Sequence, residues 1–261
     1  MELQAFCTMM ERIAPPSLAM EGDRIGLLIG TDHPEIRKVL IALDLTVDVA
    51  DEAIRGGFDL VLTHHPIFWN PVTGIYPDRY ETAAAYRLIR HGIGHYAAHT
   101  NLDAAIGGVN DALCAELGLQ NIRPLPPENL GRIGELPHAM RFGDFTALCE
   151  ERLHTRARSA GDADRMIRIV GCIGGAGGSD VEDVFHSHCD AFVTGEMKHD
   201  QALRAAFLGL CCCVLGHYET EVLVLKHLIN RLQREDFDVK YQLTQTGRTP
   251  LSCSEGGTRN E

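Results

Sequence analysis

The chain has 261 residues, of which 45% are hydrophobic and 23% charged, the composition of a soluble globular protein that can bury a substantial core. Its 36 acidic and 24 basic residues argue against a nucleic-acid backbone as the main partner, because binding one requires a basic face. No apolar run reaches the roughly 18 residues of a membrane span, and the N-terminus does not resemble a secretory signal. We therefore expect a cytoplasmic protein.

Strand-like and helix-like segments alternate along the first part of the chain. Aliphatic and β-branched runs predict the strands, and apolar residues at helical spacing predict the helices. In chain order the segments are strand Val39–Leu45, helix Val47–Gly56, strand Phe58–Thr63, helix Tyr80–His91, strand Tyr96–Ala98 and helix Val109–Leu117. This alternation predicts α/β layers.

The same order recurs in the second part of the chain. The segments there are strand Ile167–Gly171, helix Asp180–His188, strand Cys189–Thr194, helix Lys198–Leu208, strand Leu210–Leu215 and helix Thr220–Leu232. Two further segments are predicted to be irregular, a Pro- and Gly-rich connection over Asn121–His138 and a surface loop over Arg158–Arg165.

The two parts also share short sequence patterns. FDLVLT followed by His-His resembles CDAFVT followed by Gly-Glu, and AHTNLDAA resembles GHYETEVL, which aligns His99 with His217 and Asp103 with Glu221. We therefore expect an α/β fold of two similar three-layer halves, residues 1–125 and 126–245, followed by a polar tail over 246–261. Two related half-sites would then build one composite site at the interface of the halves.

His64 and His65 directly follow an apolar strand, and open α/β sheets bind ligands at the carboxyl ends of their strands. Pro66 keeps the turn extended, so the two imidazoles diverge, which suits one ligand to each of two neighbouring metals. The alternative is that the histidines are merely hydrogen-bonded at a strand end.

His217 and Glu221 favour the metal interpretation, because residues four apart on a helix share one face. Asp103 supplies a second carboxylate near a similar helix start. Three imidazoles and two carboxylates suit zinc, iron, manganese or nickel better than calcium, which prefers oxygen ligands alone. A glutamate can bridge two cations, and two cations sharing a carboxylate would activate a water between them.

With these residues in place, the sequence resembles the Nif-three-like family of dinuclear-metal proteins, many of which are labelled GTP cyclohydrolase 1 type 2. The resemblance covers nearly the whole chain. The motifs that carry it are IAPP at 13–16, GLLIG at 26–30, THHP at 63–66, HTNLDAAIGGVND at 99–111, TGE at 194–196, DQAL at 200–203 and GHYETEV at 216–222.

The resemblance implies two divalent metal ions per chain. Their ligands would be His64, His65, Asp103, His217 and Glu221, with Glu221 as the bridge. It also implies a ring-shaped homohexamer, and the chain corresponds to the short form of the family. The family usually has a small polar residue at the position of Arg24, so this chain departs from the pattern at a position that would lie on the pocket rim.

Three further residues are candidates for a catalytic role. His99 would orient a metal ligand as an outer partner, and Glu196 and His199 would donate or accept protons at a bound substrate. The alternative for each is an ordinary polar residue at a strand end.

The glycine-rich segment 171–178 lies between a predicted strand and a predicted helix, where backbone N–H groups can hold a phosphate. The alternative, which we favour, is a tight turn that allows close packing. Cys211, Cys212 and Cys213 cannot converge on one metal, because adjacent strand residues point to opposite faces, and we expect them to be buried thiols.

The leading functional hypothesis is a metal-dependent hydrolase acting on a small molecule, such as a nucleotide, through an activated water. The family label suggests opening of the guanine imidazole ring of GTP, and this is an analogy because fold and metals do not define a substrate. A non-catalytic metal-delivery protein or interaction scaffold is the alternative. A nicotinamide-dependent oxidoreductase, suggested only by the glycine-rich segment and Glu196, ranks last because it leaves the metal motifs unexplained.

Overall fold

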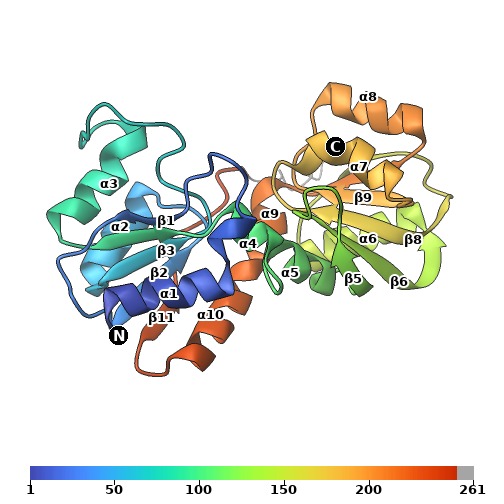
Figure 1. Cartoon of the computed structure of the whole chain (residues 1–261). Coiled ribbons are helices and arrows are strands. Elements are labelled where there is room, and N and C mark those ends of the chain that lie inside the picture. The colour runs from blue at the N-terminus through green and yellow to red at the C-terminus, as the bar shows by residue number, and fades with distance from the viewer. Residues whose placement is uncertain (252–261) are drawn as a thin grey trace, which may run out of the picture. The chain divides into compact units, whose positions relative to one another are not determined.

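The computed structural model of the protein describes residues 1–251, which form two compact units, each built around one mixed sheet (Figure 1). The first unit contains Met1–Leu113, Glu128–Gly131 and Glu221–Gly247, and the second is built chiefly from Cys114–Pro127 and Arg132–Thr220. The prediction of an α/β protein is confirmed in these two sheets. Within residues 1–251, no helix is long and apolar enough to cross a membrane.

The sheet of the first unit has five strands. In sheet order they are β1 (Gly26–Ile29), β4 (Gly94–Ala97), β3 (Leu60–Thr63), β2 (Lys38–Ala42) and β11 (Lys240–Leu243). The four strands from β4 to β11 run parallel, and β1 is antiparallel to β4. All side chains of β3 are buried, which explains its continuous apolar sequence.

Helices lie on both faces of this sheet (Figure 1). Helices α2 (Val47–Gly56) and α3 (Tyr80–Arg90) pack on the face that includes Leu40 and Val61. On the other face, Phe6 of α1 (Leu3–Ile13) meets Tyr96 edge-on, with ring centroids 5.9 Å apart. The remaining helical elements that begin or end in this unit are η1 (Pro16–Leu18), α4 (Thr100–Ala104), α5 (Val109–Glu116), α9 (His217–Glu221) and α10 (Leu223–Glu235).

The sheet of the second unit has six strands. In sheet order they are β5 (Gln120–Pro124), β6 (Arg132–Arg141), β8 (Met166–Ile173), β9 (Ala191–Thr194), β10 (Cys211–Val214) and β7 (Arg158–Ala160). Strands β8, β9 and β10 are parallel, and the other three strands pair antiparallel.

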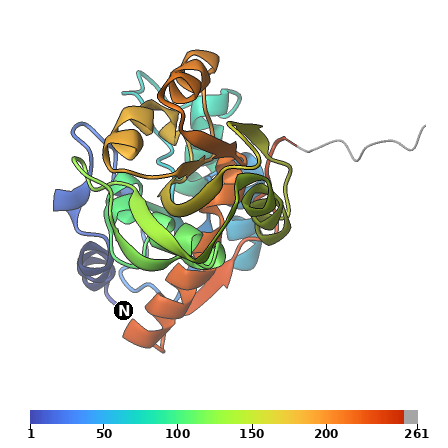
Figure 2. The same ribbon diagram turned by 90° about the vertical axis from the view of Figure 1, so that its right-hand side faces the viewer.

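Helices also cover both faces of the second sheet, as Figure 2 shows. Helices α7 (Val181–His186) and α8 (His199–Leu208) pack against the face that carries Phe192 and Cys212. Helix α6 (Phe142–Leu153) covers the other face, where Cys149 contacts Cys213. Cys212 and Cys213 thus point to opposite faces, as predicted, and Cys211–Cys213 are buried free thiols. A short 3₁₀ helix, η2 (Gly177–Asp180), precedes α7.

The two sheets repeat one pattern in detail. In each, three consecutive parallel strands end beside an antiparallel edge strand, β2-β3-β4 with β1 and β8-β9-β10 with β7. The aligned Asp59 and Asp190 make similar contacts, since each carboxylate accepts two consecutive backbone N–H groups in the first half of the preceding strand or just before it, at 2.8 and 2.9 Å in both units. This shared cap supports a duplicated origin of the two units.

The division of the chain differs from the predicted boundary near residue 125. Glu221–Gly247 belongs to the first unit because β11 pairs in parallel with β2, in which Lys240 lies opposite Lys38. At the end of this segment, Thr246 donates its backbone N–H to Glu52. Most of the predicted polar tail, residues 252–261, lies outside the described residues.

Two segments predicted to be irregular form strands instead. Asn121–His138 contains most of β5 and β6, and Arg158–Arg165 begins with β7. β5 and β7 are edge strands with largely exposed side chains, so they lack the apolar signal of a buried strand. In β6 the pairing is irregular between Glu135 and Met140, where Pro137 is tolerated because it need not donate to the ladder. The predicted helix Thr220–Leu232 is divided between α9 and α10.

The repeated aspartate cap predicts matched effects on stability. We expect Asp59→Ala and Asp190→Ala each to lower the free energy of unfolding by about 1–3 kcal/mol, because each leaves two backbone N–H groups without their acceptor. Urea unfolding followed by circular dichroism measures this change. Asp78→Ala, at an exposed loop position, is the control and should change stability little. Two variants as stable as the control would contradict a structural role for this cap.

Candidate metal centre

The end of β3 fixes the positions of His64 and His65. The Thr63 hydroxyl donates to the backbone carbonyl of His65 at 2.6 Å, and the His65 backbone N–H donates to Leu43 at 2.9 Å. These bonds hold the turn after the strand tightly against β2. Both histidines are buried, His64 with 1% of its surface exposed and His65 with 9%.

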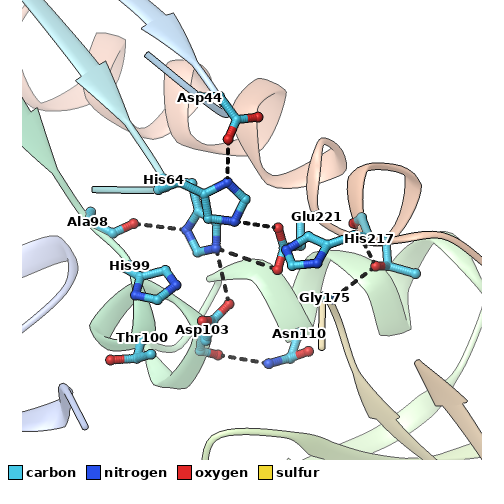
Figure 3. Close-up of polar contacts among 12 residues, drawn as sticks. Asp44, His64, Ala98, His99, Thr100, Asp103, Asn110, Gly175, His217 and Glu221 are labelled. Atoms are coloured by element: carbon cyan, nitrogen blue, oxygen red, sulfur yellow. Dashed lines mark hydrogen bonds and ion pairs between the residues drawn. The ribbon is translucent and has the colours of Figure 1, made fainter. Parts of the chain in front are cut away.

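The Nδ1 atom of each of these two imidazoles makes a hydrogen bond that fixes the orientation of the ring. His64 Nδ1 lies 2.9 Å from the carbonyl oxygen of Ala98, which follows β4 (Figure 3). His65 Nδ1 lies 2.7 Å from a carboxylate oxygen of Asp44, which follows β2. A carbonyl oxygen can only accept, so His64 Nδ1 carries a proton and Nε2 of the neutral ring carries the lone pair. This tautomer presents Nε2 as a metal ligand.

Two buried carboxylates face these Nε2 atoms. Asp103 lies in α4, and its Oδ1 is 3.6 Å from His64 Nε2. Glu221 ends α9, and its Oε1 is 3.7 Å from His64 Nε2 while its Oε2 is 3.0 Å from His65 Nε2. Figure 3 shows dashed contacts running from His64 to both carboxylates. Each carboxylate oxygen of Glu221 therefore lies close to the Nε2 atom of a different histidine.

Burial and charge together set the protonation of the cluster. Burial alone would lower the pKa of His65, but the hydrogen bonds to Asp44 and Glu221 outweigh it and raise that pKa to about 10. His64 behaves similarly, since Asp103 and Glu221 raise its pKa against the effect of burial. Burial raises the pKa of Asp103 to about 6. Without a metal, the carboxylates are thus compensated by protons on the histidines.

His64 Nε2 is the atom that indicates a cation. It is buried and has no hydrogen-bond partner, although two carboxylate oxygens lie within 3.7 Å of it. Its lone pair, when the ring is neutral, faces two carboxylates, which is electrostatically unfavourable unless a proton or a metal cation lies between them. The ligand atoms of His64, Asp103 and Glu221 all lie within 4.8 Å of one another, as a shared cation requires. The donor set, nitrogen with carboxylate oxygen, fits zinc and other first-row divalent metals.

His99 belongs to the same cluster. Its ligand atom lies within 4.8 Å of those of His64 and His65. Its Nδ1 is held 2.8 Å from Asp23, which also accepts from the backbone N–H and the hydroxyl of Thr100. Burial acts against ionisation of Asp23, but the hydrogen bonds from His99 and Thr100 keep its pKa well below its usual range. His99 thus has the same arrangement as His64 and His65, with Nδ1 fixed by an oxygen.

The remaining predicted residues lie in the second unit. His217 begins α9, four residues before Glu221, and its Nδ1 lies 3.1 Å from Oε1 of Glu196, which follows β9. Glu196 therefore holds a candidate ligand, and its predicted role as a proton donor or acceptor at a substrate stays a prediction. His199 is exposed as the first residue of α8, and its predicted role stays a prediction.

The glycine-rich segment is explained by close packing in the second unit. A Cβ atom at Gly177 would lie 2.5 Å from Ile173, and one at Gly178 would lie 2.8 Å from the carbonyl oxygen of Glu196. The backbone N–H of Gly175 already donates to Thr220 at 3.0 Å. These contacts account for the glycines as a tight turn that allows close packing, which is the interpretation favoured from the sequence.

Asp44 and Asp23 were not found from the sequence. Each approaches its histidine through tertiary structure, across 21 residues for Asp44 and 76 for Asp23. Asp44 had a detectable signal, because it follows β2 at the same sheet edge where His64 and His65 follow β3. Asp23 lies in an irregular segment, where spacing carries no such signal.

Comparisons with known proteins agree with the motifs. A family model described as Duf34/NIF3 (NGG1p interacting factor 3) matches residues 1–250 of the chain. A Streptomyces coelicolor protein named GTP cyclohydrolase 1 type 2 homolog is 31% identical, with 96% of this chain and 94% of that protein covered.

Solved structures show the same fold. A Staphylococcus aureus hypothetical protein superposes with a TM-score of 0.90 at 27% identity, and a Bacillus cereus protein related to NIF3 with 0.88 at 26% identity. Both comparisons cover 97% of this chain and 99% of the other chain.

The raised pKa of His65 predicts that divalent cations displace a proton. At pH 7.5 the metal-free His65 is protonated, so zinc binding should release about one proton per ion bound there. The release should shrink as the pH rises through about 10, because the metal-free histidine then becomes neutral before the ion binds. Calorimetric titrations in buffers with different ionisation enthalpies measure it. Asp44→Asn, which removes one of the charges that raise this pKa, should reduce the release, and release that is absent in both proteins would contradict the assignment.

Proposed function

Because this chain belongs to the Duf34/NIF3 family, we propose that its buried cluster is a two-metal centre that hydrolyses a small, nucleotide-like substrate. The ligands are His64, His65, Asp103, His217 and Glu221. The relatives named GTP cyclohydrolase 1 type 2 homolog make GTP the first substrate to try. Zinc, iron, manganese and nickel are the metals that suit these ligands.

The observation that carries the proposal is the position of Glu221. Its Oε1 faces His64 Nε2 and its Oε2 faces His65 Nε2, so the two oxygens of one buried carboxylate address two imidazoles. A carboxylate used in this way is suited to bridge two cations. His217 supports the proposal because it lies one helical turn before Glu221 and has its Nδ1 fixed by Glu196.

Divalent metals in such a centre lower the pKa of a coordinated water, which supplies a nucleophile near neutral pH. The chain's own residues prepare the site for this chemistry. Ala98, Asp44 and Asp23 fix the Nδ1 atoms of the three histidines, so Nε2 is directed at the cluster without a change of tautomer. Burial of His64 and Glu221 excludes bulk water and strengthens the interactions of the site.

A non-catalytic metal-holding or metal-delivery role is the second candidate. The near-complete burial of His64 and Glu221 favours it, because structural metal sites are closed whereas catalytic sites keep an open position. An exchangeable water on the loaded metal, detected by water-proton relaxation of the manganese form, would favour the hydrolase.

We also propose self-association into a homohexameric ring, as the family resemblance implies. Light scattering after gel filtration tests it. A mass six times the 28.7 kDa of the chain supports the ring, and a monomeric mass contradicts it.

Elemental analysis of the purified protein tests the metal centre. We expect about two divalent metals per chain, and a clear loss in Glu221→Gln and His217→Ala, because each removes a ligand. Glu219→Ala is the matched control, since it removes a carboxylate from the same helix α9 two residues from Glu221. Loaded protein should then hydrolyse GTP or a phosphoester, and Glu221→Gln should be at least about 100-fold slower because the metals are lost.

Less than one metal per chain, unchanged in the variants and not restored by added zinc, manganese or iron, would contradict the metal centre. Full metal content with no hydrolysis and no exchangeable water would favour the metal-holding role.

A further inference from the structure

Trp69 is an exposed aromatic ring beside the histidine cluster. It lies in the irregular segment between β3 and α3, and 59% of its surface is exposed. Its ring centroid is 5.1 Å from that of His99, with the planes perpendicular, and 5.9 Å from that of His65. Trp69 therefore borders the candidate metal centre while much of its surface faces solvent.

The residues before Trp69 fix the position of its segment. The two residues before it, Ile67 and Phe68, are partly buried and pack against the apolar core beneath α2 and α3. Pro66, after His65, limits the conformation of the turn. Trp69 is thus exposed on a segment that is packed against the core and begins directly after the candidate ligands His64 and His65.

Exposure alone does not indicate a site, because single exposed apolar side chains are common on protein surfaces. Tyr80 is 93% exposed and Phe207 is 90% exposed. Trp69 differs from them in its neighbours, since it contacts two imidazoles of a buried cluster that can hold a metal. Part of its ring is therefore both exposed to solvent and close to the cluster.

We infer that Trp69 is a stacking wall for a planar heteroaromatic ring, such as a nucleobase, carried by the ligand of the metal centre. The inference rests on the proposed function, because it names the class of molecule that the metal centre takes. An indole face binds flat π-systems whatever their hydrogen-bonding pattern, so this contact selects planarity.

A cation is the other ligand that an indole face attracts. The divalent metals of the proposed centre would repel a cationic ligand at this distance, whereas a neutral base attached to anionic phosphates experiences no such repulsion. The ligand that suits both the tryptophan and the metals is therefore a planar ring with neutral or anionic substituents.

The chain has one tryptophan, so Trp69 reports its own contacts by fluorescence. The metal-loaded protein would be titrated with guanosine, adenosine, cytidine and uridine, excited at about 300 nm to limit absorption by the bases, with tripolyphosphate and choline as probes that lack the ring. We expect saturable quenching by at least one nucleoside and none by tripolyphosphate or choline.

Substitutions distinguish a stacking wall from a nearby reporter. Calorimetry should show that Trp69→Leu weakens the best nucleoside by roughly 10- to 100-fold, and that Trp69→Phe, which keeps a flat ring, weakens it less. Tyr80→Leu, an exposed aromatic position at the start of α3, is the matched control and should bind like the unsubstituted protein.

The metal content of each variant separates this inference from the proposed function. Normal metal content with weaker nucleoside binding in Trp69→Leu supports the stacking wall. Normal metal content with no quenching by any nucleoside, quenching only by choline, or equal affinity in Trp69→Leu overturns it and leaves the metal centre standing. Absent metal in the unsubstituted protein overturns the proposed function. In that case, saturable quenching of the metal-free protein by a nucleoside supports the stacking wall, and no quenching overturns it as well.

Discussion

The candidate site depends on one hydrogen bond between the ends of two neighbouring strands, from His64 Nδ1 to the carbonyl oxygen of Ala98. Strands β3 and β4 run parallel with Thr63 opposite Ala97, and the backbone N–H of Ala98 donates to Thr63. This register brings the residues that follow the two strands side by side. The carbonyl then decides which imidazole nitrogen is protonated, and the lone pair of His64 is directed at Asp103 and Glu221. Asp44 and Asp23 apply the same constraint to His65 and His99.

The repeat explains why the His-His pair occurs in only one half. Thr63 and Thr194 occupy the same position in the two sheets, but Thr194 is followed by Gly195 where Thr63 is followed by His64. A Cβ atom at Gly195 would lie 2.7 Å from both the Gly175 carbonyl oxygen and the Thr220 hydroxyl. The second unit has therefore no room for a side chain at the position where the first unit carries a candidate ligand.

The predictable parts of this protein are those with a local signal. The helix Val47–Gly56 was placed correctly because it has helical spacing and ends at Gly57, whose φ of 60° favours glycine. His64, His65, Asp103 and Glu221 could be selected because they follow a buried strand directly or lie in a short helix after one. The edge strands β5 and β7 were missed because exposed strands lack an apolar pattern. The pairing of β11 with β2 and the partner of His99 depend on tertiary contacts that spacing does not encode.

The central claim is that fixed Nδ1 atoms leave the Nε2 atoms to hold cations between the two carboxylates. Anomalous diffraction from crystals of the zinc-loaded protein, collected at the zinc edge, tests it most directly. We predict a peak within about 2.2 Å of His64 Nε2 and of carboxylate oxygens of Asp103 and Glu221, with the Nδ1 bond to Ala98 retained. A cluster without anomalous density at full zinc loading, or zinc bound through Nδ1 of His64, would contradict the account.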